Sequence, residues 1–150
     1  MDYLEKLGQE LLDETHFPDM QLTIDRVLKH AVSEKKSDGV VFGLSGGIDS
    51  VIVAYLTAKI FGKKALALVM PDSTVSPSSE TGDALKVIGE LGLDYKLIDI
   101  DVMHKIYSNH LEPDERALGN LRARIRANII YYYANLKNYL VLGTSDKSEY

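Results

Sequence analysis

Cysteine is absent from this chain of 150 residues. Its absence excludes disulfide bonds, thiolate metal sites and cysteine nucleophiles. One excluded nucleophile is the cysteine with which many enzymes release ammonia from glutamine. The histidines, His16, His30, His104 and His110, lack the spacing of metal ligands. We therefore expect them at surfaces or helix ends rather than in a metal cluster.

Long hydrophobic runs and an excess of positive charge are missing as well. No apolar stretch approaches the ~20 residues that span a bilayer. The first residues, 1–5, do not form the basic start of a secretory leader. The formal net charge of -5 argues against nonspecific binding to nucleic acid. We expect a cytoplasmic protein that binds neither membranes nor nucleic acid.

What the chain does contain is an alternation of strand-like and helix-like segments. Apolar residues make up 45% of it and charged residues 26%, as in globular proteins. Strands are expected at residues 40–44, 65–70, 95–100 and 139–143, and helices at residues 51–61, 78–92, 102–107 and 114–136. This order predicts an α/β fold: a parallel sheet of about four or five strands with helices on both faces, as in Rossmann-like proteins. Gly119 and Asn120 could interrupt the last helix.

Two more helices are expected ahead of the first strand. Leucines form a helical stripe over residues 3–14, and a second helix begins near Pro18 or Asp19. We therefore divide the chain into N-terminal helices, residues 1–36, and an α/β core, residues 39–150.

Residues 45–50, with the sequence Ser-Gly-Gly-Ile-Asp-Ser, connect the first expected strand to its helix and are called the Ser45–Ser50 loop below. A glycine-rich turn at a helix start leaves backbone N–H groups unpartnered at the positive end of the helix dipole, which attracts phosphate. Gly46 and Gly47 are expected to supply backbone freedom and to let a phosphate touch the main chain. A plain strand-to-helix connection is the alternative.

The side chains of this loop favour the phosphate site over that alternative. Ser45 and Ser50 add hydroxyl donors, and Asp49 places a carboxylate where a phosphate-bound Mg²⁺ could sit. The loop contains no lysine and its glycines are adjacent, so it is not a Walker-type phosphate loop.

A second group of polar residues is expected at the same edge of the sheet. In open parallel sheets ligands bind at the carboxyl ends of the strands. The loops after Leu44 and Met70 and the turn at Thr144 all lie at that edge. Asp49 and Glu149 could together form an oxygen shell for Mg²⁺. The alternative for Glu149 is an ordinary exposed glutamate.

Three arginines, Arg122, Arg124 and Arg126, lie on the last expected helix. Arg122 and Arg126 share a face, whereas Arg124 points elsewhere. A guanidinium group is a fork for phosphate or carboxylate, so at least one of them is expected to bind such a group. For Arg122 a solvated helix charge is an equally good interpretation.

Two other clusters are interpreted structurally. Asp99 and Asp101 follow the third strand and are expected to cap a helix, with a metal or ribose role as the alternative. Tyr131, Tyr132 and Tyr133 are expected to pack rather than to stack on bases.

Together these segments resemble the ammonia-dependent NAD synthetases of the archaeal type, within the N-type ATP pyrophosphatases. The resemblance is carried by residues 43–50, 120–126, 131–135 and 143–149. The Ser45–Ser50 loop is shared by the whole superfamily, and the arginine segment followed by the Gly143-Thr144 turn makes the match narrower. The resemblance implies an adenine nucleotide alpha hydrolase-like fold, with the chain, residues 1–150, as a single domain.

The resemblance also implies roles for individual residues. ATP would contact Gly43, Leu44, Ser45, Gly46, Gly47, Ile48, Asp49, Ser50 and Thr144. Mg²⁺ would be held by Asp49 and Glu149, and deamido-NAD would be contacted by Arg124. No protein nucleophile is expected.

The implied reaction is the ATP-dependent amidation of deamido-NAD by ammonia, through an adenylated intermediate, with release of AMP and pyrophosphate. The family is dimeric, so a homodimer is expected. Members of the family extend beyond residue 150, so the C-terminal part of the fold is expected to be missing here. The alternatives are another ATP pyrophosphatase, such as a tRNA-modifying ligase or a GMP synthetase subunit, and a non-catalytic nucleotide-binding or dimerisation module.

Overall fold

The computed structural model describes residues 17–143, with side chains from residue 19 onward. The chain divides into two units, Met1–Lys36 and Ser37–Tyr150. In the first unit the described part is helix α2, Phe17–Glu34, which confirms the helix expected from Pro18 or Asp19. The helix expected at residues 3–14 lies outside the described residues.

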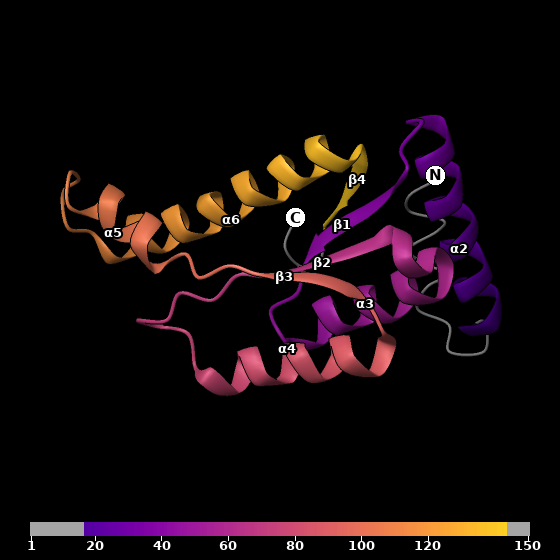
Figure 1. Cartoon of the computed structure of the whole chain (residues 1–150), viewed down its shortest axis with the longest axis horizontal. Coiled ribbons are helices and arrows are strands. Elements are labelled where there is room, and N and C mark those ends of the chain that lie inside the picture. The colour runs from indigo at the N-terminus through magenta and orange to yellow at the C-terminus, as the bar shows by residue number, and fades with distance from the viewer. Residues whose placement is uncertain (1–16, 144–150) are drawn as a thin grey trace, which may run out of the picture. The chain divides into compact units, whose positions relative to one another are not determined.

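The second unit is built on a parallel sheet. Its described strands are β1 (Gly39–Gly43), β2 (Ala65–Val69), β3 (Asp94–Leu97) and β4 (Tyr139–Leu142). They lie in the order β3-β2-β1-β4 and every pair is parallel. In this register Val41 lies between Leu66 and Val141. The predicted parallel α/β sheet is confirmed (Figure 1).

Helices cover both faces of the sheet. Helix α3 (Ile48–Phe61) follows β1 and continues into a short 3-10 turn, η2 (Gly62–Lys64), and α4 (Ser78–Leu91) follows β2. These two helices pack on one face, and α6 (Glu115–Lys137) packs on the other (Figure 1). Helix α5 (Asp101–Ser108) connects β3 to the loop before α6 and packs against α6.

Helix α6 runs through Gly119 and Asn120 without the interruption that the sequence suggested. A glycine inside a helix costs only about 1 kcal/mol relative to alanine. Two features oppose that cost: Asp114 caps the helix by accepting a hydrogen bond from the Ala117 amide at 2.7 Å, and the helix buries Ile125 against the sheet. Packing and capping therefore outweigh the local preference.

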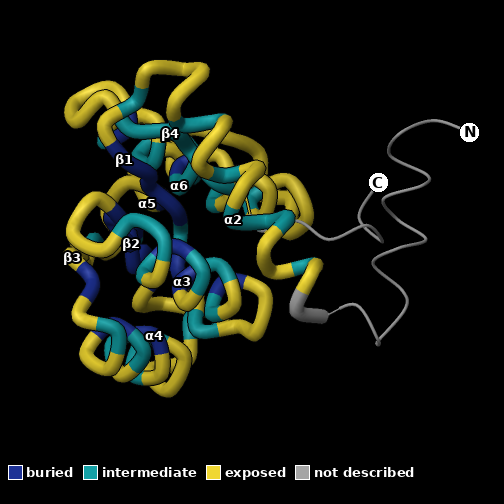
Figure 2. The backbone as a smooth tube through the Cα atoms, turned by 90° about the vertical axis from the view of Figure 1, so that its right-hand side faces the viewer, coloured by how far each residue is buried: buried dark blue, intermediate teal, exposed yellow. Residues whose placement is uncertain are grey.

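The core lies along the two central strands, which Figure 2 shows as buried. On the α6 side the buried cluster consists of Val41, Leu66, Leu68, Met70, Ile100, Ile125 and Ala134. Because helices cover both faces, β1 and β2 are buried on both sides, as their continuous apolar sequences indicate. The edge strand β3 is exposed along its length. No helix among residues 17–143 is long and apolar enough to cross a membrane.

Candidate functional site at the carboxyl edge of the sheet

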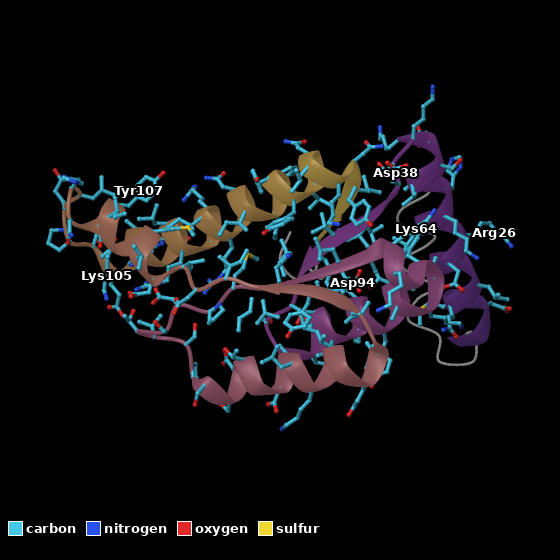
Figure 3. All side chains as sticks on the ribbon, viewed as in Figure 1. Arg26, Asp38, Lys64, Asp94, Lys105 and Tyr107 are labelled. Atoms are coloured by element: carbon cyan, nitrogen blue, oxygen red, sulfur yellow. The ribbon has the colours of Figure 1, made fainter. Side chains whose placement is uncertain are left out.

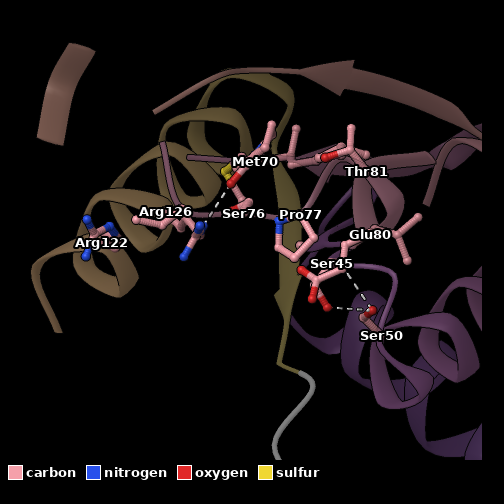
Figure 4. Close-up of a pocket in the computed structure, with 15 residues that line it drawn as sticks. Ser45, Ser50, Met70, Ser76, Pro77, Glu80, Thr81, Arg122 and Arg126 are labelled. Carbon is pink, nitrogen blue, oxygen red and sulfur yellow. Dashed lines mark hydrogen bonds between the residues drawn. The ribbon is translucent and has the colours of Figure 1, made fainter. Parts of the chain in front are cut away.

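The Ser45–Ser50 loop is held in shape by its own hydroxyl groups (Figure 4). The Ser45 amide donates to Ser50 Oγ at 3.2 Å, and Ser50 Oγ donates to the Gly47 carbonyl at 2.8 Å. The Gly47 amide donates to Ser45 Oγ at 3.2 Å. The two serine side chains therefore organise the loop as well as offering polar groups to a ligand.

The two glycines of the loop have different roles. Gly46 has a φ of 91°, and a Cβ there would lie 2.6 Å from the carbonyl oxygen of Glu80 in α4. Gly47 has a φ of -71° and a ψ of 154°, an extended conformation that any residue adopts. The expectation that both glycines supply unusual backbone freedom is therefore wrong for Gly47, because the close contact with α4 and the positive φ fall on Gly46 alone.

Helix α3 begins at Ile48, within this loop, and its first backbone donors are unsatisfied. Gly47 is its N-cap and no side chain caps it. Among the described residues, the amides of Ile48 and Asp49 have no hydrogen-bond partner. The carboxylate of Asp49 is exposed in the first turn. An anion placed here would meet both free amides and the positive end of the helix dipole.

A cavity of about 500 Å³ lies beside the loop, at the carboxyl ends of β1 and β2 (Figure 4). Its lining combines the loop, the segment after β2, the start of α4 and two arginines of α6. The lining residues are Gly43, Leu44, Ser45, Ser50, Leu68, Val69, Met70, Pro71, Val75, Ser76, Pro77, Glu80, Thr81, Arg122 and Arg126. The location agrees with the expectation that loops after the first two strands meet at one site.

The arginines of α6 separate as their spacing predicts. Arg122 and Arg126 line the cavity, whereas Arg124 is exposed and is not among the lining residues. Arg122 Nε donates to Asp72 Oδ2 at 2.6 Å, and Arg126 Nε donates to the Met70 carbonyl at 2.8 Å. Arg122 is thus a paired side chain and not a solvated helix charge. The contact of Arg124 with deamido-NAD stays a prediction.

Asp72 is a site residue that the sequence reasoning missed. Its side chain is fully buried, and Oδ1 accepts hydrogen bonds from the amide and the hydroxyl of Thr74. Burial acts to raise the pKa of Asp72, but the hydrogen bonds from Thr74 and Arg122 outweigh it and lower the pKa to about 2. A usable signal was present: Asp72 follows β2 closely at the edge where ligands bind.

His104 also departs from expectation, because it is buried and not at a surface. Its Nδ1 lies 3.9 Å from Asp72 Oδ2. Its Nε2 has no hydrogen-bond partner among the described residues. Helix α5 packs against α6, and His104 is its buried residue.

Of the two aspartates after β3, Asp99 satisfies a donor at the start of α5, whereas Asp101 is the first residue of that helix and does not cap it. Asp99 Oδ1 accepts from the amides of Asp101 at 3.0 Å and Ser73 at 3.2 Å, which satisfies a donor at the start of α5. These two hydrogen bonds, the one from Asp101 first, hold the pKa of Asp99 below its usual range. Asp101 pairs with Lys105, one turn along α5 and labelled in Figure 3, at 2.9 Å. No group of three or more potential metal ligands occurs in the described part of the chain.

Two predicted site residues, Thr144 and Glu149, lie outside the described residues. Of the predicted magnesium pair, only Asp49 is therefore described. Gly43, at the end of β1, pairs with Leu68 in β2 and lines the cavity. The roles assigned to Thr144, Glu149 and Asp49 stay predictions.

The sheet, the glycine turn at a helix start and the cavity at the carboxyl edge define an α/β protein of the nucleotide-binding class. Residues 21–150 match the family model of NAD synthase. The NH(3)-dependent NAD(+) synthetase of Hyperthermus butylicus is 43% identical over 143 residues, which are 93% of this chain and 51% of that protein. The chain therefore belongs to the NAD synthase family, as the resemblance indicated.

Solved structures agree with this assignment. The NH3-dependent NAD synthetase of Campylobacter jejuni, in complex with the nitrate ion, has a TM-score of 0.84 and 38% identity, covering 88% of this chain and 58% of that one. The NMN synthetase of Francisella tularensis has a TM-score of 0.82 and 28% identity, covering 88% and 56%. The chain spans about half the length of the curated relatives it matches.

Proposed function

We propose that this chain carries the ATP-binding part of an ammonia-dependent NAD synthetase. In the reaction, a carboxylate oxygen of deamido-NAD attacks the α-phosphorus of ATP, and the bond to the β-phosphate oxygen breaks to release pyrophosphate. Ammonia then attacks the carbonyl carbon of the acyl adenylate, loses a proton and displaces AMP. Activation is needed because a free carboxylate is a poor acyl donor.

The observation that carries the proposal is the position of the free amides of α3 beside the cavity. The amides of Ile48 and Asp49 can bind the pyrophosphate end of ATP, and the cavity can receive the rest of the nucleotide. Donors aimed at the leaving group stabilise the charge that grows on it, without any protein nucleophile. The apolar side chains of Leu44, Val69 and Met70 suit a base and a sugar.

The residues present also suit a magnesium ion. Asp49 is an exposed carboxylate beside unpartnered amides, and it makes no hydrogen bond or ion pair with another described residue. We propose that Asp49 and Glu149 hold Mg²⁺ and that Thr144 contacts ATP. When bound, Mg²⁺ would neutralise part of the charge on the phosphates. Arg124 would contact deamido-NAD.

A homodimer is also proposed. Helices α5 and α6 expose large apolar and aromatic side chains: Val102, Met103, Ile106 and Tyr107 on α5, and Tyr131, Tyr132 and Leu136 on α6. Tyr107 is labelled at the exposed end of α5 in Figure 3. Exposed apolar side chains of this kind are often covered by a partner. Sedimentation equilibrium should give twice the monomer mass, and a concentration-independent monomer would contradict the dimer.

Calorimetric titration with ATP and Mg²⁺, combined with an assay of pyrophosphate release, tests the function. We expect ATP binding, and release of pyrophosphate that depends on deamido-NAD. The similarity to NMN synthetase makes the deamidated form of NMN the acceptor to compare. Binding without release under any acceptor would favour a nucleotide-binding module, and absence of ATP binding would contradict the proposal.

A further inference from the structure

The two arginines that line the cavity each use the Nε atom of the guanidinium group for a hydrogen bond within the protein. Arg122 uses Nε to reach the Asp72 carboxylate, and Arg126 uses Nε to reach the Met70 carbonyl. Figure 4 shows both side chains on α6, with Arg126 reaching Met70. Their terminal Nη groups make no hydrogen bond to any described residue. Up to eight N–H bonds, four from each guanidinium, are therefore available to a ligand.

Two carboxylates accompany the two guanidinium groups at this position. Arg122 is paired with Asp72, and Glu80 also lines the cavity. Burial and the nearby charge of Arg122 lower the pKa of Arg126. The charges of Asp72 and Glu80 act in the opposite direction and raise that pKa. The unused Nη groups, rather than a net charge, therefore suit an anion in the cavity, and a phosphate group is the anion that a pair of guanidinium forks suits best.

The position of Arg122 depends on Asp72. A free arginine side chain loses rotamer freedom when it is held in one orientation. Asp72 is itself fixed, because Thr74 donates two hydrogen bonds to its other oxygen and the surrounding side chains bury it completely. The buried carboxylate therefore offers a rigid point to which the guanidinium is fastened 50 residues further along the chain.

We propose that Asp72 is a positioning residue, which holds Arg122 so that Arg122 and Arg126 together bind a phosphate group of the nucleotide. The inference rests on the proposed function for the identity of the nucleotide. Asp72 acts through Arg122 and does not itself touch the ligand, since its two oxygens are already occupied by Thr74 and Arg122. It links the loop after β2 to α6, and both elements contribute to the cavity.

The test is a double-mutant cycle with Asp72→Asn, Arg122→Gln and the double variant, with affinities for ATP and for adenosine measured by calorimetry or ligand-observed NMR. If Asp72 acts through Arg122, each single change weakens ATP binding about tenfold, and the double change weakens it no further. Adenosine binding stays unchanged, because adenosine has no phosphate. Arg116→Gln, an exposed arginine on the same helix, is the matched control and leaves both affinities unchanged.

A purely structural role gives a different result. If Asp72 only stabilises the loop after β2, Asp72→Asn weakens the binding of ATP and of adenosine equally, or the effects of the two single changes add. Either outcome overturns the proposal. Arg122→Lys covers the case in which Asp72→Asn fails to fold. It keeps a positive charge opposite Asp72 but lacks the fork, so we expect the same loss as with Arg122→Gln, and full ATP affinity in this variant would overturn the proposal.

Different results would contradict the proposed function and the proposed role of Asp72. If the unmodified chain binds ATP and Asp72→Asn binds it equally well, the positioning role is wrong while the ATP site stands. If the unmodified chain does not bind ATP, titration with pyrophosphate alone decides the inference. Pyrophosphate binding that Arg122→Gln and Asp72→Asn both remove would support the anion site, and binding that neither variant changes would overturn it.

Discussion

Two loops at the carboxyl edge of the sheet are built in opposite ways. Most of the Ser45–Ser50 loop after β1 is exposed, although Ser50 is buried, and its hydrogen bonds join residues at most five positions apart. The loop after β2 is organised around the buried carboxylate of Asp72, whose partner Arg122 lies 50 positions away. The first loop leaves backbone amides free for a ligand, and the second uses a buried charge to hold a side chain. One site thus combines local backbone geometry with long-range side-chain contacts.

The largest effect is expected at Gly46, where the first loop touches α4. Gly46→Ala should lower the free energy of unfolding by about 3 kcal/mol, because the residue has a positive φ and the new Cβ would lie 2.6 Å from a backbone oxygen. Gly47→Ala is the matched control and should cost less than about 1 kcal/mol, since its φ is ordinary and its Cβ would meet only Ser45 Oγ, at 3.4 Å. Urea unfolding measures both, and equal losses would contradict the difference between the glycines.

The stability of the second loop should depend on pH. The pKa of Asp72 falls from an ordinary 3.8 to about 2 in the folded chain. The carboxylate therefore contributes stability that is present above pH 3.8 and is lost as the pH falls toward 2. The loss should be about 2 kcal/mol, and Asp72→Asn should remove that part of the pH dependence.

The measurement is urea unfolding at a series of pH values between about 5 and 2. Asp83→Asn is the control, because Asp83 forms an exposed ion pair with Lys86 and such pairs contribute little. A stability curve of Asp72→Asn that runs parallel to that of the unmodified chain would show that Asp72 is not the responsible group.

In the first loop, we expect the carboxylate of Asp49 to make ATP binding dependent on Mg²⁺. Asp49→Asn should weaken Mg²⁺-dependent ATP binding about tenfold, equivalent to about 1.4 kcal/mol, and should leave the free energy of unfolding unchanged. The side chain is exposed and has no described partner, so its loss removes no internal contact. Calorimetric titration with and without Mg²⁺ measures the effect, and an unchanged affinity would remove Asp49 from the metal site.

The smallest effect is expected at the start of α6, where a side chain of the protein itself accepts a hydrogen bond from a backbone amide. Asp114→Ala should cost about 1 kcal/mol of stability, because Asp114 accepts a hydrogen bond from the Ala117 amide at the start of α6. It should not change ATP affinity, in contrast to Asp49→Asn. Thermal unfolding and titration of the same sample separate the two quantities, and a loss of ATP affinity would contradict the contrast between the two helix starts.

The sequence predicted the alternation of strands and helices and the position of the Ser45–Ser50 loop between the first strand and its helix. Each of these depends on neighbours within a few positions, so a local pattern contains the information. It also predicted that Arg122 and Arg126 share a face, since helical spacing decides that. It did not predict the buried position of His104, the partner of Arg122, or which glycine is indispensable. In each case the deciding group lies on another element: helix α6 for His104, Asp72 for Arg122 and the Glu80 carbonyl for Gly46.

The order of polar and apolar residues by itself determined the parallel α/β fold, because its periodicity depends on near neighbours in the chain. The short motifs of the sequence carried the resemblance to the NAD synthase family. The tertiary structure alone decided that a buried aspartate faces an arginine from a distant helix, that α6 runs on through Gly119, and that α4 comes close enough to exclude a side chain at Gly46. The physical reason is that burial and long-range hydrogen bonds depend on which helices and loops meet in space, and residues far apart in the chain meet only in the folded structure.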